Sequence, residues 1–545
     1  MPRNVRMLRH AARSSRRLIV GVVLGMASLA TGLAIAATPP HATVQTGVLE
    51  GRRMQVDGVN LNVFQGIPYA APPTGTRRWK PPQPAAHWNG VRQATAFGPR
   101  CMQRSIFSDM RFRSNGMSED CLYLNVWAPA NATSRKPPVL VYFFGGGFIA
   151  GDGSEYRYDG ASLAARGIVT VTVNYRLGVF GFMALPALTA ESPHHASGNY
   201  GLLDQNAALR WVRANIAQFG GDPHHITIGG ESAGSISVHA QMASPLSRKL
   251  IAGAIGESGA LIAPISPLPL AAAEQRGTQF MQQVGAESLK ALRSMPADAL
   301  LQATGAKDTV HFGPDIDGYF LTERPVDTFR KGEQAHVPLL VGSNSQEGFY
   351  TAILKDATPT PAHYKAALQK MFGDEASTAL KLYPGKNVAQ VKRSATALAG
   401  DLFIAHSTWR WMNQQRETGK APVYYYYFDQ ARPLKRDARP GDTPNPGAVH
   451  SGEIEYALGN LDTNRVYAWT TADHNVSRIM EGYFAQFIKH GNPNGRGLPY
   501  WSPVRKARGG LLRQHIGTPT RNYPDQNAAR QRFLTRYFAH RPSAF

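Results

Sequence analysis

The sequence predicts an α/β protein with a large, mostly parallel central sheet flanked by helices. Two observations support this fold class. Residues 139–144 are a continuous apolar run and residues 168–173 are a β-branched run, both of strand length, which is typical of strands buried on both faces. A helical pattern at 202–219 separates them from a further strand at 225–230, and this order favours a right-handed parallel arrangement. We also expect a small antiparallel sheet at the N-terminal edge and helical insertions that form a cap.

The composition is that of an ordinary globular chain. Its 545 residues are 43% hydrophobic and 18% charged, and we find no internal repeat or low-complexity run. We therefore expect one domain over residues 37–545. The formal net charge of +22 indicates electrostatic attraction to anionic surfaces. The basic residues are scattered and match no nucleic-acid-binding module, so no nucleic-acid partner is expected.

Residues 1–36 have the pattern of an export signal. Residues 1–17 contain six arginines and no acid, and 18–36 are uncharged and mostly apolar, ending in an A-x-A type cleavage site. The pair Arg16–Arg17 leaves twin-arginine and general export both open. The alternative is an uncleaved membrane anchor, but the small-residue end favours cleavage. We expect a periplasmic or secreted protein, with no membrane span after the signal.

The remaining elements follow from local patterns. Residues 44–64 alternate in polarity around Asp57–Gly58, a hairpin turn signal. Glycines and a proline after Phe219 end the 202–219 helix. Further along the chain we expect cap helices at 268–303, a strand at 337–342, helices at 361–411, a strand at 423–428 and a closing helix at 478–490.

The stretch 225–238 predicts a nucleophile at Ser232. A β-branched strand leads into Gly-Glu-Ser-Ala-Gly, which matches G-x-S-x-G, and a small-residue helix follows. The serine must lie on a strained strand-to-helix corner, where Gly230 and Gly234 leave room for the close packing. The helix that begins near Ala233 directs its free N–H groups toward this corner. The alternative is an ordinary loop between a strand and a helix.

Three glycines, Gly145–Gly147, follow the buried strand 139–144 and predict an oxyanion loop. Glycines at a strand end let the backbone turn and expose its N–H groups to a developing negative charge. The loop matches the H-G-G-G type that accompanies G-x-S-x-G, although Phe144 replaces its histidine. A flexible turn is the alternative.

Position in the chain selects the base and the acid. A serine needs a base and an orienting acid, and in hydrolases of this topology the order is serine, acid, histidine, each after a strand. Glu347 follows the strand 337–342 and His450 follows the strand 423–428. The alternatives are a helix N-terminal carboxylate for Glu347 and a loop histidine for His450.

Two further sets of residues compete for these roles. The rival acids Asp315 and Asp317 precede the strand 337–342 rather than follow it. The segment around Ser258 lacks the final glycine of the motif, so we interpret this serine as a strand-end residue near the site.

The two cysteines, Cys101 and Cys121, suggest one disulfide in an exported protein, with free thiols as the alternative.

Taken together, the motifs resemble the type-B carboxylesterase family, which includes the cholinesterases. The matching segments are 118–125 (SEDCLYLN), 145–148 (GGGF), 199–205 (NYGLLDQ), 219–223 (FGGDP), 230–234 (GESAG), 346–348 (QEG) and 450–454 (HSGEI). The resemblance implies an α/β-hydrolase fold and hydrolysis of small-molecule esters.

The resemblance also implies roles for individual residues. It implies a catalytic triad of Ser232, His450 and Glu347, and an oxyanion hole formed by the N–H groups of Gly146, Gly147 and Ala233. It further implies a Cys101–Cys121 disulfide and places Glu231 beside the nucleophile, in contact with the triad rather than part of it. No metal or nucleotide cofactor is expected, because we find neither zinc-ligand spacing nor a phosphate-binding fingerprint.

One departure from the family concerns the segment between the cysteines. In cholinesterases this loop carries a tryptophan that binds cations, whereas here it has no tryptophan and contains Arg104, Phe107, Arg111, Phe112 and Arg113. We therefore expect no preference for choline esters and hypothesise that small to medium neutral or anionic esters are accepted. Hydrolysis of amides, carbamates or lactones at the same site stays open, as does a non-catalytic binding protein of the same fold.

Overall fold

The computed structural model describes residues 38–130, 136–307, 309–504 and 511–539. The predicted export signal at 1–36 lies outside the described residues. Contacts between residues divide the chain into a unit of residues 1–38 and a unit of residues 39–545. All of the architecture below belongs to the second unit.

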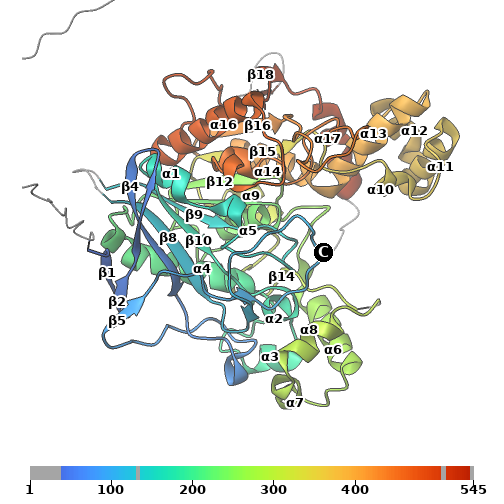
Figure 1. Cartoon of the computed structure of the whole chain (residues 1–545). Helices are drawn as coiled ribbons and strands as arrows, with labels where there is room; N and C mark the ends of the chain where they lie inside the picture. Colours follow the sequence, from blue (N-terminus) through green and yellow to red (C-terminus); the bar gives the residue numbers. More distant parts are fainter. Residues whose placement is uncertain (1–37, 131–135, 308, 505–510, 540–545) are drawn as a thin grey trace, which may run out of the picture. The chain divides into compact units, whose positions relative to one another are not determined.

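Eleven strands of the described residues form one large sheet, drawn in Figure 1. Its order is β18-β17-β16-β15-β12-β11-β9-β10-β8-β4-β3. The strands from β10 to β17 pair in parallel, and antiparallel strands complete both edges. The predicted α/β class and mostly parallel sheet are confirmed. The strand bounds are β3 Arg52–Val56, β4 Val59–Pro68, β8 Tyr123–Pro129, β9 Val139–Phe143, β10 Val169–Val173, β11 Ile226–Glu231, β12 Gly253–Glu257, β15 Leu339–Asn344, β16 Val423–Phe428, β17 Leu512–Ile516 and β18 Arg521–Pro524.

The central strands are buried on both faces, as their apolar sequences require. Every residue of β9, β10, β11 and β12 is buried. Since helices cover both faces of such a parallel sheet, no polar alternation is needed along these strands. The register aligns the ends of β9 and β11 next to each other, with Phe143 opposite Gly230. The glycine loop after β9 and the serine motif after β11 therefore emerge at one edge of the sheet.

The N-terminal edge differs from the prediction in one respect. The hairpin at Asp57–Gly58 joins β3 to β4, but this pair extends the main sheet because β4 also pairs with β8. The small sheet is separate, with β1 (His41–Val44) antiparallel to β2 (Gly47–Glu50) and β5 (Val91–Gln93) parallel to β2. The alternation in 44–64 predicted the strands but not the partner that each one takes.

Two short pairs complete the strands, β6 Arg100–Cys101 with β7 Met117–Ser118, and β13 Leu268–Pro269 with β14 Asp315–Ile316.

The predicted helices are present with shifted ends. The helix expected at 202–219 is α4, Tyr200–Asn215, continued by the 3-10 turn η3, Ile216–Phe219, and Gly220 ends it with a left-handed φ of 85°. The closing helix α16 spans Thr471–His490 and starts at a capping box formed by Thr470 and Asp473. The other α-helices are α1 Ala161–Ala165, α2 Gly178–Phe182, α3 Pro186–Glu191, α5 Ala233–Ala243, α6 Leu270–Gln283, α7 Leu289–Ser294, α8 Ala297–Ala303, α9 Pro325–Lys331, α10 Thr351–Leu354, α11 Pro361–Phe372, α12 Ala376–Leu382, α13 Val388–Gly400, α14 His406–Thr418, α15 Ile454–Ala457 and α17 Ala528–Ala539.

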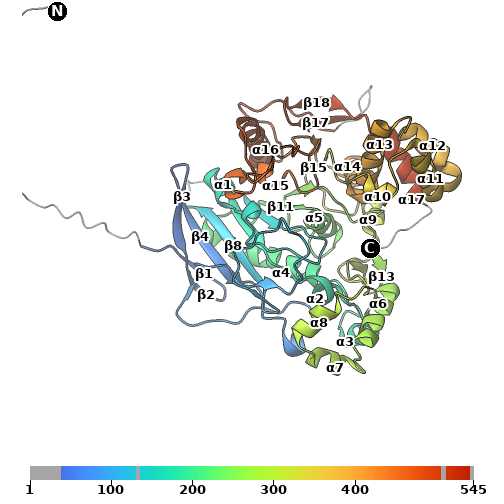
Figure 2. The ribbon, with the colours of Figure 1, turned by 45° about the vertical axis from the view of Figure 1, so that its right-hand side comes forward.

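Two groups of helices extend beyond the sheet. Figures 1 and 2 both place α6, α7 and α8 together, as expected for cap helices at 268–303. Both views also gather α10–α13 beside α17, and these helices share a separate hydrophobic core. A π-helical turn, Asp401–Ala405, connects α13 to α14. Within the residues that the structure describes, no helix is both long and apolar enough to cross a bilayer.

Candidate active site

Ser232 lies on a strained corner between β11 and α5. Its φ of 56° and ψ of −119° are unusual for a residue with a side chain. The corner depends on its glycines, because a Cβ at Gly234 would lie 2.0 Å from the Phe143 carbonyl oxygen. The Ser232 N–H donates to the carbonyl oxygen of Glu257 at 2.8 Å, which fixes the corner against β12. The geometry is that of a nucleophile elbow.

The structure brings together the three side chains predicted as a triad. His450 Nε2 lies 2.9 Å from Ser232 Oγ, and His450 Nδ1 lies 2.7 Å from Glu347 Oε2. Glu347 is buried, whereas the His450 side chain is 25% exposed. One imidazole thus joins a serine and a carboxylate, the arrangement that lets a histidine act as a base held by an acid.

A second layer of polar groups holds Glu347. Its Oε1 accepts from the Asn344 N–H at 2.7 Å and from Ser258 Oγ at 2.5 Å. Ser258, which the sequence placed near the site without making it a nucleophile, therefore contacts the acid of the predicted triad. Buried Glu453 also belongs here, since Asn344 Nδ2 donates to its Oε2 at 2.5 Å. Sequence reasoning missed Glu453, although its position in the His-Ser-Gly-Glu segment could have identified it.

Glu231 adds a carboxyl group on the serine side of the histidine. Its Oε1 lies 3.3 Å from His450 Nε2. Burial raises the pKa of Glu231 to about 8, and His450 opposes that rise. Burial alone would lower the pKa of His450, but the carboxylates of Glu231 and Glu347 raise it above its ordinary value. Glu231 is thus placed to influence the titration of the histidine.

The glycine loop after β9 lines the same cavity as the serine. Gly146 and Gly147 have φ of 115° and 63°, conformations that glycine adopts without strain. A Cβ on Gly146 would lie 2.2 Å from the Ala150 carbonyl oxygen, so this position requires glycine. Ala233, the first residue of α5, lines the cavity too. The three residues predicted to form an oxyanion hole therefore line the same cavity as Ser232.

The cavity at Ser232 has a volume of about 530 Å³. Apolar side chains dominate its lining, including Met110, Ile236, Leu402 and Ile404. Phe403, on the π-helical turn, also lines it and presents its ring to the His450 ring, with centroids 5.0 Å apart. A volume of this size accommodates a small to medium organic molecule.

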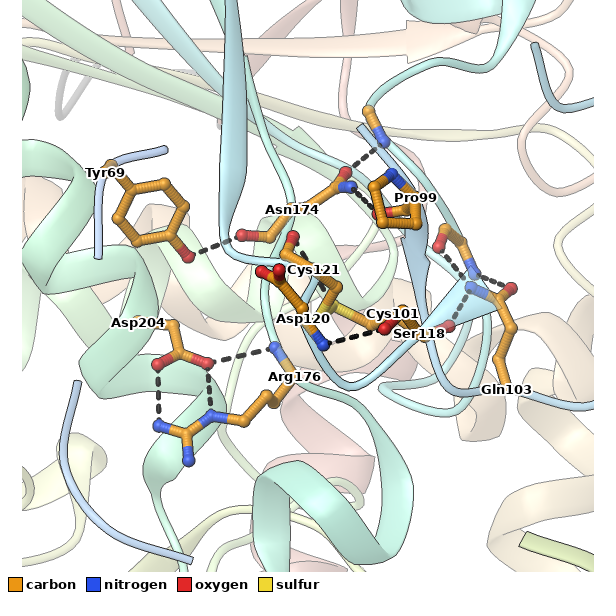
Figure 3. The surroundings of a disulfide bond; sticks show 12 residues. Tyr69, Pro99, Cys101, Gln103, Ser118, Asp120, Cys121, Asn174, Arg176 and Asp204 are labelled. Atoms are coloured by element: carbon orange, nitrogen blue, oxygen red, sulfur yellow. Dashed lines mark hydrogen bonds and ion pairs between the residues drawn. A yellow bond between two sulfur atoms is a disulfide. The ribbon is translucent and has the colours of Figure 1, made fainter. Parts of the chain in front are cut away.

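A disulfide joins Cys101 to Cys121, as predicted, and closes the loop between them. Figure 3 shows Gln103 beside this bond. Its Nε2 donates to the Gly151 carbonyl oxygen at 2.8 Å, while the Gly151 N–H donates to its Oε1 at 2.9 Å. The loop is thus fastened to the segment that follows the glycine loop, and its residues Phe107, Asp109 and Met110 line the cavity.

The arginines of this loop are not where the sequence suggested. In the part of the chain that the structure describes, Arg104, Arg111 and Arg113 lie outside the lining of the catalytic cavity. Arg104 packs against Gly305, and Arg113 pairs with Asp159 at 2.6 Å. The cation on the cavity wall is instead Arg157, from the 3-10 turn η2, Tyr156–Tyr158.

The rival acids have other roles. Asp317 Oδ1 accepts the backbone N–H groups of Tyr319, Phe320 and Leu321, so it shapes a turn. Asp315 is buried against Asn199, which donates to its carbonyl oxygen at 2.7 Å. Among the described residues, the acid bonded to His450 Nδ1 is Glu347.

Fold and site together define a serine hydrolase of the α/β-hydrolase class. Comparison with known proteins agrees, since the sequence profile described as Carboxylesterase family matches residues 38–531. The chain belongs to the carboxylesterase family. It is 36% identical over 494 residues to a fumonisin B1 esterase of Sphingopyxis macrogoltabida, covering 86% of this chain and 85% of that protein.

Mammalian relatives show a similar degree of identity. A pyrethroid hydrolase, Ces2e, of Rattus norvegicus is 34% identical over 492 residues, covering 85% of this chain and 84% of the relative. A cocaine esterase of Homo sapiens is 34% identical over 496 residues, covering 85% of each chain. The family and these relatives support a serine carboxylic-ester hydrolase, so the chain is an enzyme of the carboxylesterase type.

Proposed function

We propose that this carboxylesterase acts through a triad of Ser232, His450 and Glu347. The observation that carries the proposal is the His450 ring, with its two nitrogens 2.9 Å from Ser232 Oγ and 2.7 Å from Glu347 Oε2. Ser232 Oγ attacks the ester carbonyl carbon while His450 Nε2 takes the hydroxyl proton. Glu347 holds the imidazole in orientation and stabilises its positive charge.

The second half of the reaction releases the acid. The negative oxygen formed by the attack is stabilised by the N–H groups of Gly146, Gly147 and Ala233. The C–O bond to the alcohol breaks, and His450 returns the proton to the departing oxygen. Water then attacks the acyl-Ser232 ester by the same steps and frees the carboxylic acid.

Ser232→Ala is the direct test of the triad. We expect kcat/KM for p-nitrophenyl butyrate to fall by about 10⁴-fold or more, because the nucleophile is lost. A fluorophosphonate probe should label the unaltered protein and fail to label this variant. Ser258→Ala serves as the control, since that variant should still be labelled. Full activity in Ser232→Ala would refute the proposal.

We infer further that the preferred substrates are small to medium esters that are neutral or anionic. The apolar lining supports neutral groups, and Arg157 supplies a cation to the cavity wall. Esters of one alcohol with neutral, anionic and cationic acyl groups would test this inference, and a clear preference for the cationic ester would contradict it.

We propose that the protein is exported and acts in the periplasm or outside the cell. The basic start, apolar stretch and A-x-A end of residues 1–36 support this location. Cell fractionation with N-terminal sequencing tests it, and an intact Met1 on a cytoplasmic protein would contradict it. We also infer an attraction to anionic surfaces from the net charge.

A further inference from the structure

A second, larger cavity adjoins the catalytic one. Its volume is about 940 Å³, and Asp109 and Arg157 line both cavities. Arg157 Nη2 donates to the Asp109 carboxylate at 3.0 Å and to its carbonyl oxygen at 3.1 Å. This ion pair therefore forms the shared wall. Asp109 is the accessible member, with 47% of its side chain exposed against 6% for Arg157.

Charges of both signs line this second cavity in nearly equal number. The carboxylates come from Asp57, Asp109, Glu155, Asp159 and Asp462, and the guanidinium groups come from Arg111, Arg113, Arg157 and Arg465. An anionic ligand would meet these carboxylates, and a cationic ligand would meet the arginines. Neither sign of charge gains an overall attraction, so the lining favours an uncharged ligand that both donates and accepts hydrogen bonds.

Two buried atoms of the lining have hydrogen-bonding capacity left over. Glu155 is 2% exposed, and its Oε1 pairs with Arg157 Nε at 2.7 Å. Its Oε2 and Arg113 Nη2 have no hydrogen-bond partner among the described residues. One is an acceptor and the other a donor, but both are closed off from solvent, so a ligand in the cavity does not reach them. A hydroxyl group of a ligand would instead pair with the accessible groups of the lining, the Asp109 carboxylate and the Arg465 guanidinium.

An aromatic ring adds a surface for C–H groups. Tyr156 lines the cavity and is 42% exposed, so its ring is accessible to a ligand. The Arg113 guanidinium lies over this ring, 4.8 Å from its centroid, and holds it in place. An exposed ring beside paired donors and acceptors suits a ligand with apolar C–H faces and many hydroxyl groups.

We propose that the second cavity is a subsite for a polyhydroxylated part of the ester, such as a sugar or sugar alcohol. The proposal rests on the proposed function, because the ester bond must lie at Ser232 while the polyol occupies the second cavity, which adjoins the catalytic one at Asp109. Tyr156 and Arg465, both at the surface of the second cavity, would act as specificity-determining residues. The apolar part of the same substrate would fill the catalytic cavity.

Two pairs of esters of matched length test the proposal. In the first pair, sorbitol butyrate carries the polyol on the alcohol side, and n-hexyl butyrate has a six-carbon chain without hydroxyl groups in its place. In the second pair, ethyl gluconate carries the polyol on the acyl side, and ethyl hexanoate is its apolar partner. The variants are Tyr156→Ala and Arg465→Ala, with Tyr156→Phe to retain the ring. Tyr500→Ala and Arg393→Ala are matched controls, since both residues are exposed and lie outside the lining of the two cavities.

The measured quantity is the ratio of kcat/KM for the polyol ester to that for its apolar partner. We expect Tyr156→Ala and Arg465→Ala to lower this ratio by about fivefold to tenfold in one pair, and Tyr156→Phe and the controls to preserve it. An unchanged ratio in both pairs, or no cleavage of either polyol ester, overturns the subsite. If the unaltered protein also failed to cleave the apolar esters, the result would instead count against the proposed function.

Discussion

Glu231, Glu347 and Glu453 are buried beside the histidine that contacts Ser232. Glu347 bonds to His450 Nδ1, while Glu231 approaches Nε2, the nitrogen that also faces the serine. Both carboxylates raise the pKa of His450, although burial opposes them. Groups coupled this closely titrate together. The acid limb of the activity profile therefore reports on the histidine and Glu231 jointly.

The Glu231→Gln variant should shift that limb. Removing a carboxylate that favours the imidazolium lowers the pKa of His450, so the free base exists at lower pH. We expect the acid limb of kcat/KM to move down by roughly one pH unit. A pH profile with p-nitrophenyl butyrate measures this, with the exposed Glu287→Gln as the control for net charge. No shift would mean that Glu231 is uncharged where the histidine titrates.

Arg432 holds the residue that follows His450. Its Nη2 donates to the Ser451 carbonyl oxygen at 2.9 Å and to Glu455 Oε2 at 2.6 Å, and both side chains of this ion pair are buried. Ser451 needs such support because its φ is 62°, a left-handed conformation that costs a serine free energy. We interpret Arg432 as a positioning residue for the histidine.

Arg432→Lys should impair turnover more than substrate binding. Lysine keeps the charge but lacks the fork that reaches the carbonyl oxygen and the carboxylate together. We expect kcat to fall by about tenfold with KM nearly unchanged, since small displacements of a catalytic group are costly. Steady-state kinetics measure both quantities. Arg176→Lys is the control, because it makes the same change in another buried ion pair, Arg176–Asp204. Equal loss of kcat in both variants would indicate a general loss of stability.

The individual residues show what sequence can and cannot predict. Ser232, Glu347 and His450 were chosen as a candidate triad because each follows a predicted strand in the order that the topology requires, and the structure brings their side chains together. Glu453 and Arg432 were missed. The position of Glu453 in the His-Ser-Gly-Glu segment could have identified it, whereas an arginine that bonds to a carbonyl oxygen leaves no motif. The sequence also placed the loop arginines near the substrate, whereas the backbone path directs Asp109 there.

At the scale of elements, strands were predicted better than their partners. Strand β16 has the predicted bounds, and β9 and β10 differ by one residue each. Each of these strands is an unbroken run of β-branched, aromatic or aliphatic residues, so composition predicts where it begins and ends. The hairpin β3–β4 was predicted as part of a small sheet, but it joined the main one because pairing with β8 depends on residues far away in the chain.

The disulfide loop is the element that most directly shapes the catalytic cavity. The double variant Cys101→Ala, Cys121→Ala removes the covalent link between two positions that are 20 residues apart in the sequence. We expect a loss of about 3 kcal/mol of unfolding free energy and a melting temperature lower by a few degrees. KM should rise, since Phe107, Asp109 and Met110 depend on the loop for their positions. Calorimetry and kinetics measure the two effects.

Treatment with a reductant provides the control for this prediction. Dithiothreitol should move the unaltered protein toward the properties of the double variant and leave the double variant itself unchanged. A double variant with an unaltered KM would show that the anchoring of Gln103 to Gly151 is sufficient to hold the loop.

For the whole molecule, the predicted class rested on agreement between independent patterns. Strand spacing, helix periodicity and the order of serine, acid and histidine all pointed to one topology, and the eleven strands of the described residues realise it. The shapes of the cavities could not be predicted. They depend on loops from distant parts of the chain, such as 109–113 and 462–466, which meet only in the folded protein.

The net charge acts at this same scale. The six arginines at positions 1–36 contribute to the total of +22, and their removal with an export signal would leave +16 on residues 37–545. The remaining charge is spread over the chain, so its attraction to an anionic surface should be long-ranged and non-specific. Such attraction weakens as salt shortens the screening length from about 30 Å at 0.01 M to about 8 Å at 0.15 M.

The chain 37–545 should therefore bind vesicles that contain phosphatidylglycerol, and salt should release it. We expect co-sedimentation at low ionic strength to fall by at least about tenfold at 0.3 M sodium chloride, because several charge contacts weaken together. Phosphatidylcholine vesicles of the same size are the control and should bind little at either salt concentration. Equal binding to both lipids would point to apolar contact through exposed side chains such as Phe349 or Tyr500, and would contradict an electrostatic origin.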